Sequence, residues 1–548
     1  MQPTIAGLID AVREGDLALP EFQRDYRWPA QYIEELLRSV ARGWPIGTLL
    51  LLDQSASAKG LKLEARSIEK APDCKKRPEN LILDGQQRVT ALYHAMNGLG
   101  DSVYYLNLAS VLNAGEFLDE ALGSTTGKQL TRTLGSDDER RKNKIILLKE
   151  LYSTELFADW LGFIPKKERN AYAALRDEHL SLFREHTVAV ERLPNSLPVE
   201  AIAKIFERTN RGFLRLDAFD LMVAIMYPHG FKLRDKWSVA VSANPILKRF
   251  EVAPIEILRL IALREHLRQK EHRVSPQTVK GVRQSDVLEV KPATVKKEWT
   301  SAVAAYVRAL TLAESHWGVI RKRIVPAEAQ LLPLADALYG GNVRNGSSKY
   351  KKLSRWFWAA IFSRQYARAA NTRAVSDSEA LRAWLKPSGP EPRYVENFKV
   401  STEDFVLVEE GNEILVKGLC CLLVSDGARS WTKAAGGGLP SLLTETEAEL
   451  AVHHVFPKKF MARKSKDTLR LLPDVDAPAN QVLITASLNG KLLNEAPEYS
   501  AKNPEVDIGG LKSHRVDPAR MKGSQYKAFV NARAAELVPV VDRAVKGY

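Results

Sequence analysis

Hydrophobic positions near the start of the chain alternate between helical spacing and short uninterrupted runs. Residues 3–14 and Ala30–Arg42 each carry apolar side chains along one face, which predicts two amphipathic helices. Gln86–Met96 has the same spacing and predicts a third helix. The intervening short apolar runs predict strands at Leu17–Pro20, Thr48–Leu52 and Leu81–Leu83. Short strands mixed with helices predict an α/β or α+β domain.

Helical spacing dominates the rest of the chain. Residues 145–230 and 231–400 are predicted to be mostly helical, and 401–425 is predicted to hold further helices. The Pro- and Gly-rich segment Lys386–Pro392 is the clearest boundary. A chain of 548 residues is too long for one core. We therefore expect a multidomain α+β protein, with an α/β domain, a mainly helical connector and a C-terminal domain at 1–228, 229–400 and 401–548.

Composition excludes some classes of protein. No run of about 18 uncharged apolar residues is present, so a membrane span is not expected. The first residues, Met-Gln-Pro-Thr, lack the basic and apolar regions of a secretory signal. Cys74, Cys420 and Cys421 are too few for a disulfide framework and suggest buried thiols in a reducing cytoplasm. We expect a cytoplasmic protein.

Positive charge is unevenly distributed. The net charge is +14, and from Asn342 to Ser376 eight basic residues occur with no acidic one. These residues, the basic stripe, are Arg344, Lys349, Lys351, Lys352, Arg355, Arg364, Arg368 and Arg373. Such a stripe favours a phosphate backbone as its partner. The interleaved aromatic residues, Tyr350, Trp356, Phe357, Trp358, Phe362 and Tyr366, are more typical of the core side of a helix.

Two adjacent histidines, His453 and His454, follow an apolar-alternating run near the C-terminus. Neighbouring side chains on an extended segment point to opposite faces, so one ring can hold a metal while the other faces elsewhere in the site. Asn480 and Asn489 lie downstream on either side of a short apolar run. Histidine pairs and loop asparagines are common in proteins without activity, but their order here suggests a metal-assisted phosphodiester nuclease. A zinc site lacks support, since only His514 lies nearby as a further ligand.

These four residues can be given roles. His453 and Asn489 are the candidate ligands of Mg²⁺ or another divalent cation, which prefers oxygen ligands and retained waters. His454 is the candidate general base, and Asn480 braces the loop. The arrangement resembles the HNH (His-metal finger) nuclease domain of GmrSD-type restriction proteins. The resemblance rests on His453–Pro457, Asn480–Ile484, Asn489–Leu492 and Pro497–Tyr499, and implies a ββα-metal fold embedded in helices.

Two polar clusters interrupt the apolar pattern of the N-terminal region. Asp84–Arg88 (Asp-Gly-Gln-Gln-Arg) lies at a strand-to-helix turn, and Leu19–Trp28 contains Gln23, Arg24, Tyr26 and Arg27. The start of a helix offers backbone amides to an anion, and paired arginines can clamp phosphate oxygens. An Asp-Gly pair at a strand end is otherwise an ordinary turn, so both interpretations stay open. No Walker A motif is present, which excludes a P-loop NTPase.

These clusters resemble the GmrS-like N-terminal domain of the same family. The resemblance implies a ParB/sulfiredoxin-like fold that binds and hydrolyses a nucleoside triphosphate, with GTP, UTP, CTP and ATP all open. The residues implied to bind it are Gln23, Arg24, Tyr26, Arg27, Asp84, Gly85, Gln86, Gln87, Arg88 and Asn210, with Asp84 and Arg88 also in catalytic roles. Arg211 and Phe213–Leu214 depart from the family pattern around Gly212, which puts the Asn210 segment in doubt.

The sequence therefore predicts an NTP-regulated, divalent-metal-dependent DNA endonuclease. Its expected partner is double-stranded DNA, in the family modified phage DNA, and its expected role is prokaryotic anti-phage defence. Whether the protein forms a homodimer or a larger oligomer stays open. One alternative is a nucleotide-gated DNA-binding regulator with a structural, non-cleaving C-terminal domain. A second is an enzyme that acts on RNA.

Overall fold

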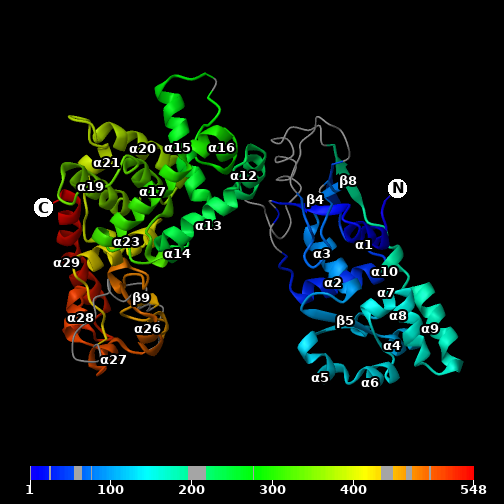
Figure 1. Cartoon of the computed structure of the whole chain (residues 1–548). Coiled ribbons are helices and arrows are strands. Elements are labelled where there is room, and N and C mark those ends of the chain that lie inside the picture. Colours follow the sequence, from blue (N-terminus) through cyan, green and yellow to red (C-terminus); the bar gives the residue numbers. More distant parts are fainter. Residues whose placement is uncertain are drawn as a thin grey trace. The chain divides into compact units, whose positions relative to one another are not determined.

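The computed structural model describes residues 2–21, 23, 26–54, 65–75, 77–194, 218–275, 277–432, 449–463, 472–492 and 495–547. Two compact units divide the chain, Met1–Leu233 and Arg234–Tyr548. Figure 1 shows strands and helices mixed in the first unit and mainly helices in the second. The protein is thus α+β, as expected. The division into three domains stays a prediction.

A five-stranded sheet lies at the centre of the first unit. Its strand order is β3-β1-β4-β2-β8, from Ala65–Arg66, Leu17–Pro20, Asn80–Asp84, Leu49–Asp53 and Val190–Leu193. β1 and β4 are parallel, and β2 pairs antiparallel with β4 and parallel with β8. Helices α1 (Ile5–Arg13), α2 (Ala30–Ala41) and α3 (Gln86–Asn97) share one hydrophobic core with these strands. The early strands and helices predicted from the sequence are confirmed.

A second, three-stranded antiparallel sheet follows in the order β6-β5-β7, from Leu122–Thr126, Ser102–Asn107 and Ile145–Leu147. The helices that follow or surround it are α4 (Leu108–Ala114), α5 (Leu130–Leu134), α6 (Asp137–Lys142), α7 (Leu148–Tyr152), α8 (Thr154–Gly162) and α9 (Lys166–His179). α10 (Leu182–Glu185) instead contacts α1 and α2. The prediction of a mostly helical 145–230 is right for α7 to α10 but wrong for β7 and β8. Residues of β8 pair with β2, about 140 positions earlier. The local spacing of apolar residues does not indicate a partner that distant in sequence.

The second unit is mainly helical. Its longer helices are α15 (Ile255–Glu271), α17 (Pro292–Trp317), α19 (Ser348–Phe362), α20 (Ala370–Trp384), α23 (Asn412–Ser425) and α29 (Tyr526–Lys546). The shorter ones are α14 (Pro245–Arg249), α16 (Gln284–Leu288), α18 (Leu331–Ala337), α21 (Arg393–Glu396) and α22 (Glu403–Val406). α12 (Ala218–Met226) belongs to the end of the first unit, and α13 (Leu233–Ala243) begins the second. None of the described helices is long and apolar enough to cross a membrane.

A small hairpin is set into these helices. β9 (Leu450–His454) pairs antiparallel with β10 (Gln481–Thr485), and α26 (Ala486–Leu492) follows at once. The surrounding short helices are α24 (Lys458–Met461), α27 (Pro497–Lys502) and α28 (Ile508–Ser513). The hairpin contacts α23, and α29 contacts the turn Pro478–Asn480 that begins β10. This strand–strand–helix order is the one that a ββα arrangement needs.

The aromatic residues within the basic stripe are mostly core. Trp356, Phe357, Trp358, Phe362 and Tyr366 are all buried, as their helical spacing predicts. Trp317 of α17 stacks on Phe357 of α19 with ring centroids 4.3 Å apart. These side chains fill the space between helices, so they do not add to a nucleic-acid surface.

A buried ion pair ties together the α6–β7–α7 segment of the first unit. The Arg140 guanidinium meets both oxygens of Glu150 at 2.6 and 2.8 Å, and both side chains are buried. Glu150 also accepts a hydrogen bond from the Leu147 backbone amide at 3.0 Å. Although burial alone would raise the pKa of Glu150, these hydrogen bonds lower it below its ordinary value. The carboxylate is therefore held charged at the point where β7 turns into α7.

We expect Glu150→Gln to lower the free energy of unfolding by roughly 3–5 kcal/mol, because it removes the buried partner of the Arg140 charge and leaves only the exposed Asp137. Glu168→Gln, which breaks the more exposed pair with Lys144, is the control and should cost about 0–1 kcal/mol. Urea unfolding followed by circular dichroism measures both. The wild-type contribution should be present above pH 4.5 and be lost as pH falls through the lowered pKa. Equal losses in the two variants would contradict a buried pair.

Candidate active site

The two histidines lie at the end of β9, on opposite faces of the strand. His453 is only 2% exposed, whereas the His454 side chain is 21% exposed. In the hairpin register His453 pairs with Val482 and His454 with Gln481. The alternation of an extended strand thus separates the two imidazoles, one directed inward and one toward the surface.

His453 meets Asn489, the second candidate ligand, across the hairpin. The Nδ1 atom of His453 lies 2.9 Å from Oδ1 of Asn489, in the middle of α26. Burial lowers the pKa of His453 to about 4, so its imidazole is neutral near pH 7. A neutral imidazole is the form that binds metals. The sequence separates these residues by 36 positions, and the ββα arrangement brings them into contact.

His454 is held by Asp476. Its Nε2 atom lies 2.8 Å from Oδ1 of Asp476, and Lys458 contacts the same carboxylate at 2.7 Å. A carboxylate only accepts hydrogen bonds, so Nε2 carries the proton and Nδ1 keeps its lone pair. Burial lowers the pKa of His454, and the Asp476 contact opposes this only in part. The neutral ring therefore has one nitrogen available to accept a proton.

Asn480 locks the loop that follows the histidines. It is fully buried, and its Oδ1 accepts from the Phe456 backbone amide at 2.9 Å. Its Nδ2 donates to the backbone oxygens of Phe456 at 3.0 Å and Val475 at 2.8 Å. The side chain thus fixes the chain immediately after β9 against the start of β10, while its role in catalysis stays a prediction.

Arg533 of α29 stabilises the same turn by hydrogen bonds. Its buried guanidinium donates to the backbone oxygens of Ala479 at 2.7 Å and Gln481 at 2.9 Å, on either side of Asn480. It also donates to the backbone oxygen of His514 at 3.2 Å. Burial without a carboxylate partner lowers the pKa of Arg533 to about 10, so the group remains charged near neutrality. Three backbone oxygens take the place of a counter-ion.

The Trp431 ring packs against His453. The Trp431 ring contacts His453 edge-on with centroids 5.8 Å apart, and it contacts His514 in the same way at 6.2 Å. His514 is engaged by the Arg429 backbone oxygen at 2.9 Å, so the structure gives it a packing role. The Nε2 atom of His453 is buried and has no hydrogen-bond partner among the described residues. The ring is thereby fixed by packing on one side and by Asn489 on the other.

The ligand pair fits a hard divalent cation. Neighbouring ligands of an octahedral Mg²⁺ at about 2.0–2.1 Å lie roughly 3 Å apart, close to the 2.9 Å between His453 and Asn489. Within the described ranges, no group of three or more His, Cys, Asp or Glu side chains is placed to hold a metal. A cation here would take its remaining ligands from water and substrate, as Mg²⁺ commonly does.

The N-terminal motif lies where β4 gives way to α3. Gly85 caps α3 with φ +94°, and a Cβ there would come within 2.2 Å of Leu49, so glycine is required. The Arg88 guanidinium donates to the backbone oxygens of Ile46 at 2.8 Å and Thr48 at 2.9 Å. It also contacts Asp84 at 3.2 Å. In this structure Arg88 stabilises the turn before β2. The Arg88 N–H groups that make these contacts were expected to face phosphate.

The other predicted nucleotide ligands surround this turn. Gln23 is buried and donates to the backbone oxygens of Ile82 and Leu83 at the end of β4. Gln87 accepts from the Arg27 backbone amide at 2.9 Å, and the Arg27 side chain is exposed. The structure therefore brings the Leu19–Trp28 segment onto the Asp84–Arg88 turn. Gln86 is buried at the start of α3, while Arg24 and Asn210 lie outside the described residues.

Tyr26 carries an unused polar atom at this turn. Its hydroxyl is buried and has no hydrogen-bond partner among the residues that the structure describes. Its ring contacts His94 edge-on with centroids 5.2 Å apart. Burial raises the pKa of Tyr26, so the hydroxyl stays protonated and can both donate and accept.

Most of the basic stripe is engaged within the protein. Arg364 contacts Glu409, Arg368 contacts Glu410, and Arg355 pairs with Glu391 at 2.9 Å. Lys352 donates to the Trp384 backbone oxygen at 2.6 Å, and Arg373 lies 3.9 Å from Asp377. Acidic partners distant in sequence thus neutralise charges that look free in the linear chain. That the connector faces DNA stays a prediction. It rests on those residues of the basic stripe that are not engaged within the protein.

Sequence reasoning missed Asp476, Lys458 and Arg533. Asp476 precedes Asn480 by four residues and Lys458 follows Pro457, so both lie close to the segments already singled out. An acidic residue close enough to reach His454, the proposed base, was the signal that could have identified Asp476. Arg533 lies 44 residues beyond Asn489 in an ordinary helical pattern, and nothing local marks it.

Comparison with known proteins places the first unit in context. Residues 5–227 match the family model of the GmrSD restriction endonuclease, N-terminal domain. An uncharacterized protein of Methanocaldococcus jannaschii is 23% identical over 586 aligned positions, which cover 98% of this chain and 93% of that protein. The relative therefore matches along both units, whereas the family model covers the first.

The Asp84–Arg88 turn lies inside the matched residues. A restriction endonuclease cuts DNA, so the match suggests a nuclease of restriction or defence with DNA as its substrate. Residues 5–227 are thus similar to the N-terminal domain of the GmrSD restriction endonucleases.

Proposed function

We propose that the protein is a divalent-metal-dependent HNH endonuclease that cuts DNA, regulated by a nucleoside triphosphate bound in its N-terminal unit. The observation that carries the proposal is the contact of His453 with Asn489 beside a neutral His454 on the next position of β9. The resemblance of this segment to the HNH domain and the family match of the first unit point to the same activity.

His453 and Asn489 would hold the cation, which when bound supplies positive charge to the scissile phosphate and to the leaving 3′ oxygen. The chain's own groups do the rest. Nδ1 of His454 accepts a proton from the attacking water, while Asp476 holds Nε2–H and fixes the ring. Asn480 keeps the loop after β9 from moving relative to β10. Each role uses a contact present before substrate binds.

The nucleotide would lie at the Asp84–Arg88 turn. The start of α3, the exposed Arg27 and the unpaired Tyr26 hydroxyl are the groups that support it. For both terminal nitrogens of Arg88 to face a phosphate, Arg88 would release Ile46 and Thr48, on the turn that leads into β2. Nucleotide binding would then change the conformation of this turn. Such a change gives a physical basis for regulation. The family resemblance suggests modified phage DNA as the substrate.

We expect His454→Ala to slow plasmid nicking in Mg²⁺ by at least ~10²-fold, because it removes the group that accepts the proton. Chelation of the divalent cation with EDTA should abolish nicking by the wild type. His272→Ala, an exposed histidine of the same unit, is the matched control and should cut at the wild-type rate. Equal nicking by wild type and His454→Ala would remove His454 from the mechanism. No cutting by the wild type with any divalent cation would favour the non-cleaving regulator.

Replacement of Asn489 and replacement of Asn480 should have different effects. Asn489→Ala should raise the Mg²⁺ concentration for half-maximal nicking at least ~10-fold, since it removes a ligand. Asn480→Ala should instead lower the free energy of unfolding by roughly 1–3 kcal/mol, because it leaves buried backbone groups of Phe456 without partners. Magnesium titration and urea unfolding of both variants separate these effects. An unchanged Mg²⁺ requirement in Asn489→Ala would contradict its role as a ligand.

We expect Asp84→Ala and Arg88→Ala each to lower nucleoside triphosphate hydrolysis at least ~10-fold, a loss of roughly 1.4 kcal/mol of barrier stabilisation. Asp138→Ala, an exposed acid of the same unit, is the control. Phosphate release with GTP, UTP, CTP and ATP in turn measures turnover, and thermal melting reports folding. Wild-type turnover in both folded variants would show that Asp84–Arg88 is only a turn.

A further inference from the structure

Exposed cations without partners lie beside the candidate nuclease site, on and just after the short helix α24. Lys459 and Arg463 are both exposed, and neither side chain makes a hydrogen bond or ion pair with a residue that the structure describes. The helical turn continues to Arg463, whose backbone amide donates to the Phe460 oxygen at 3.3 Å. Side chains four positions apart on a helix are neighbours, so these two charges lie on the same side of α24.

Helix α24 is close to the candidate base. It begins four positions after His454, and its first residue, Lys458, lies 2.7 Å from the Asp476 carboxylate. The same carboxylate holds His454, whose side chain is 21% exposed. Lys459 is the next residue of the chain. The unpaired charges of α24 therefore begin one position after a side chain that shares its carboxylate with the base.

A third cation comes from the segment before α29. Lys522 is exposed and has no side-chain partner within the described part of the chain. Its neighbour Gly523 packs against α24, since a Cβ at that position would come within 2.6 Å of the Phe460 ring. Three positions later, the Tyr526 hydroxyl donates to the backbone oxygen of Asp474 at 2.6 Å. These two contacts hold Lys522 next to α24 and next to the loop that carries Asp476.

The α24 cations, which are Lys459, Arg463 and Lys522, are not neutralised by the acidic residues that contact these segments. Asp476 is already engaged by two other side chains, and Glu498 accepts a hydrogen bond from a backbone amide. Like charges four positions apart on a helix repel each other. An anion that lies across them is therefore favoured.

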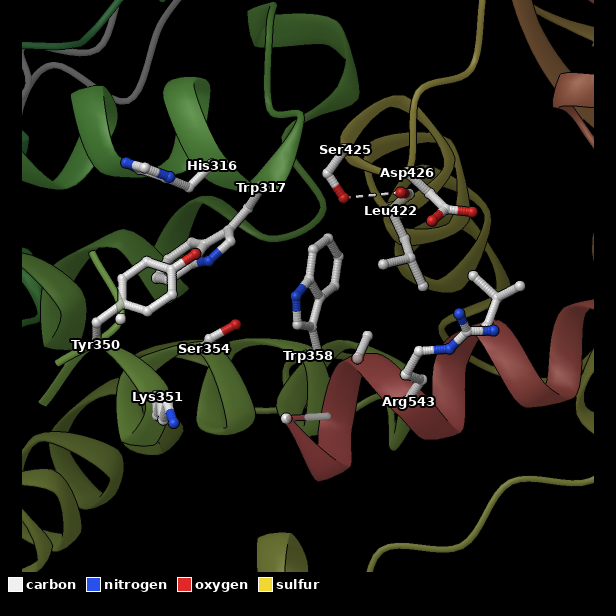
Figure 2. Close-up of a pocket in the computed structure, with 14 residues that line it drawn as sticks. His316, Trp317, Tyr350, Lys351, Ser354, Trp358, Leu422, Ser425, Asp426 and Arg543 are labelled. Carbon is white, nitrogen blue, oxygen red and sulfur yellow. Dashed lines mark hydrogen bonds between the residues drawn. The ribbon is translucent and has the colours of Figure 1, made fainter. Parts of the chain in front are cut away.

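Other exposed cations of the second unit are placed differently. Lys351 of the basic stripe and Arg543 line a cavity of about 310 Å³ and come from different helices, α19 and α29 (Figure 2). The acidic lining residue of this cavity, Asp426, is engaged by Arg515 at 2.6 Å. None of the residues that line the cavity belongs to the hairpin or to α24. This pair of cations therefore provides a comparison for the α24 cations.

We propose that the α24 cations bind the phosphate backbone of duplex DNA beside His454. A backbone presents phosphates at regular intervals, and each phosphate that a Lys or Arg neutralises releases counterions. Three exposed cations on two chain segments suit such a repeating partner better than a single small anion, which a pocket would enclose. The inference rests on the proposed endonuclease, because it takes the strand at His454 to continue across α24. It gives the DNA a surface that is separate from the basic stripe.

Salt-dependent binding tests this surface without any cutting. Fluorescence anisotropy of a labelled DNA duplex in EDTA measures the association constant over a range of NaCl concentrations. In Lys459→Gln/Arg463→Gln/Lys522→Gln, affinity should fall at least ~10-fold. The slope of log K against log [NaCl] should become less steep by about 0.9 for each lost phosphate contact, about 3 in all. Lys459→Arg/Arg463→Lys/Lys522→Arg keeps the charges and should keep the wild-type slope, and thermal melting reports folding.

Lys248→Gln/Lys296→Gln/Lys297→Gln is the charge-matched control, because it removes three exposed cations from α14 and α17, outside the hairpin and α24. It should bind with the wild-type slope. The proposal is overturned if both triple variants lose slope equally, since net charge alone would then explain the loss, or if neither does. A loss of slope in Lys351→Gln/Arg543→Gln, without one in the α24 variant, would place the DNA elsewhere and also overturn it. Tighter competition by duplex RNA than by duplex DNA would overturn DNA as the partner.

Nicking in Mg²⁺ separates the failure of this inference from the failure of the proposed function. The triple glutamine variant of the α24 cations should raise KM at least ~10-fold and change kcat little, because backbone contacts bind substrate and transition state alike. His454→Ala should instead lower kcat. A wild-type KM in the α24 variant would overturn the inference and leave the endonuclease standing. DNA binding lost in that variant, with no cutting by the wild type, would support the surface and overturn the endonuclease.

Discussion

The hydrogen bonds made by Asn480 and Arg533 are the constraint on which the C-terminal site depends. Asn480 joins the end of β9 to the start of β10, and Arg533 holds the two backbone oxygens on either side of Asn480. Asn480, Arg533 and Ala479 are buried, so a polar group of theirs left without a partner would cost about 1–3 kcal/mol. The hairpin can therefore hardly shift relative to α29 without breaking several bonds at once.

A fixed hairpin gives the two histidines different surroundings. His453 is turned inward against Trp431, where burial keeps it neutral and Asn489 meets it at 2.9 Å. His454 is turned outward to Asp476 and stays partly open to solvent. Ligand chemistry needs a neutral imidazole, and base chemistry needs an imidazole that water can reach. A two-residue motif can supply both only because an extended strand alternates its faces.

Local features of the sequence predicted what local physics determines. The turn at Gly85 and the strands and helices on both sides of it follow from spacing and turn chemistry. The order of His453, His454, Asn480 and Asn489 was visible as well. Long-range partners were not visible: β8 pairs with β2, Arg88 is engaged by Ile46 and Thr48, and Arg364 by Glu409. Charge in a linear sequence therefore overstates the charge available to a ligand.

Helix α29 connects the features of the second unit. Phe529 near its start packs against Phe456 after the histidines, and Arg533 supports Asn480. Near its end, the backbone oxygen of Val545 accepts a hydrogen bond from Arg355 of α19 at 3.1 Å. The helix from Arg533 to Val545 spans about 18 Å at about 1.5 Å per residue. Pro539 interrupts one backbone hydrogen bond on the way, but the helix continues to Lys546. Because a helix is stiff along its axis, the backbone of α29 sets the distance between the hairpin and α19.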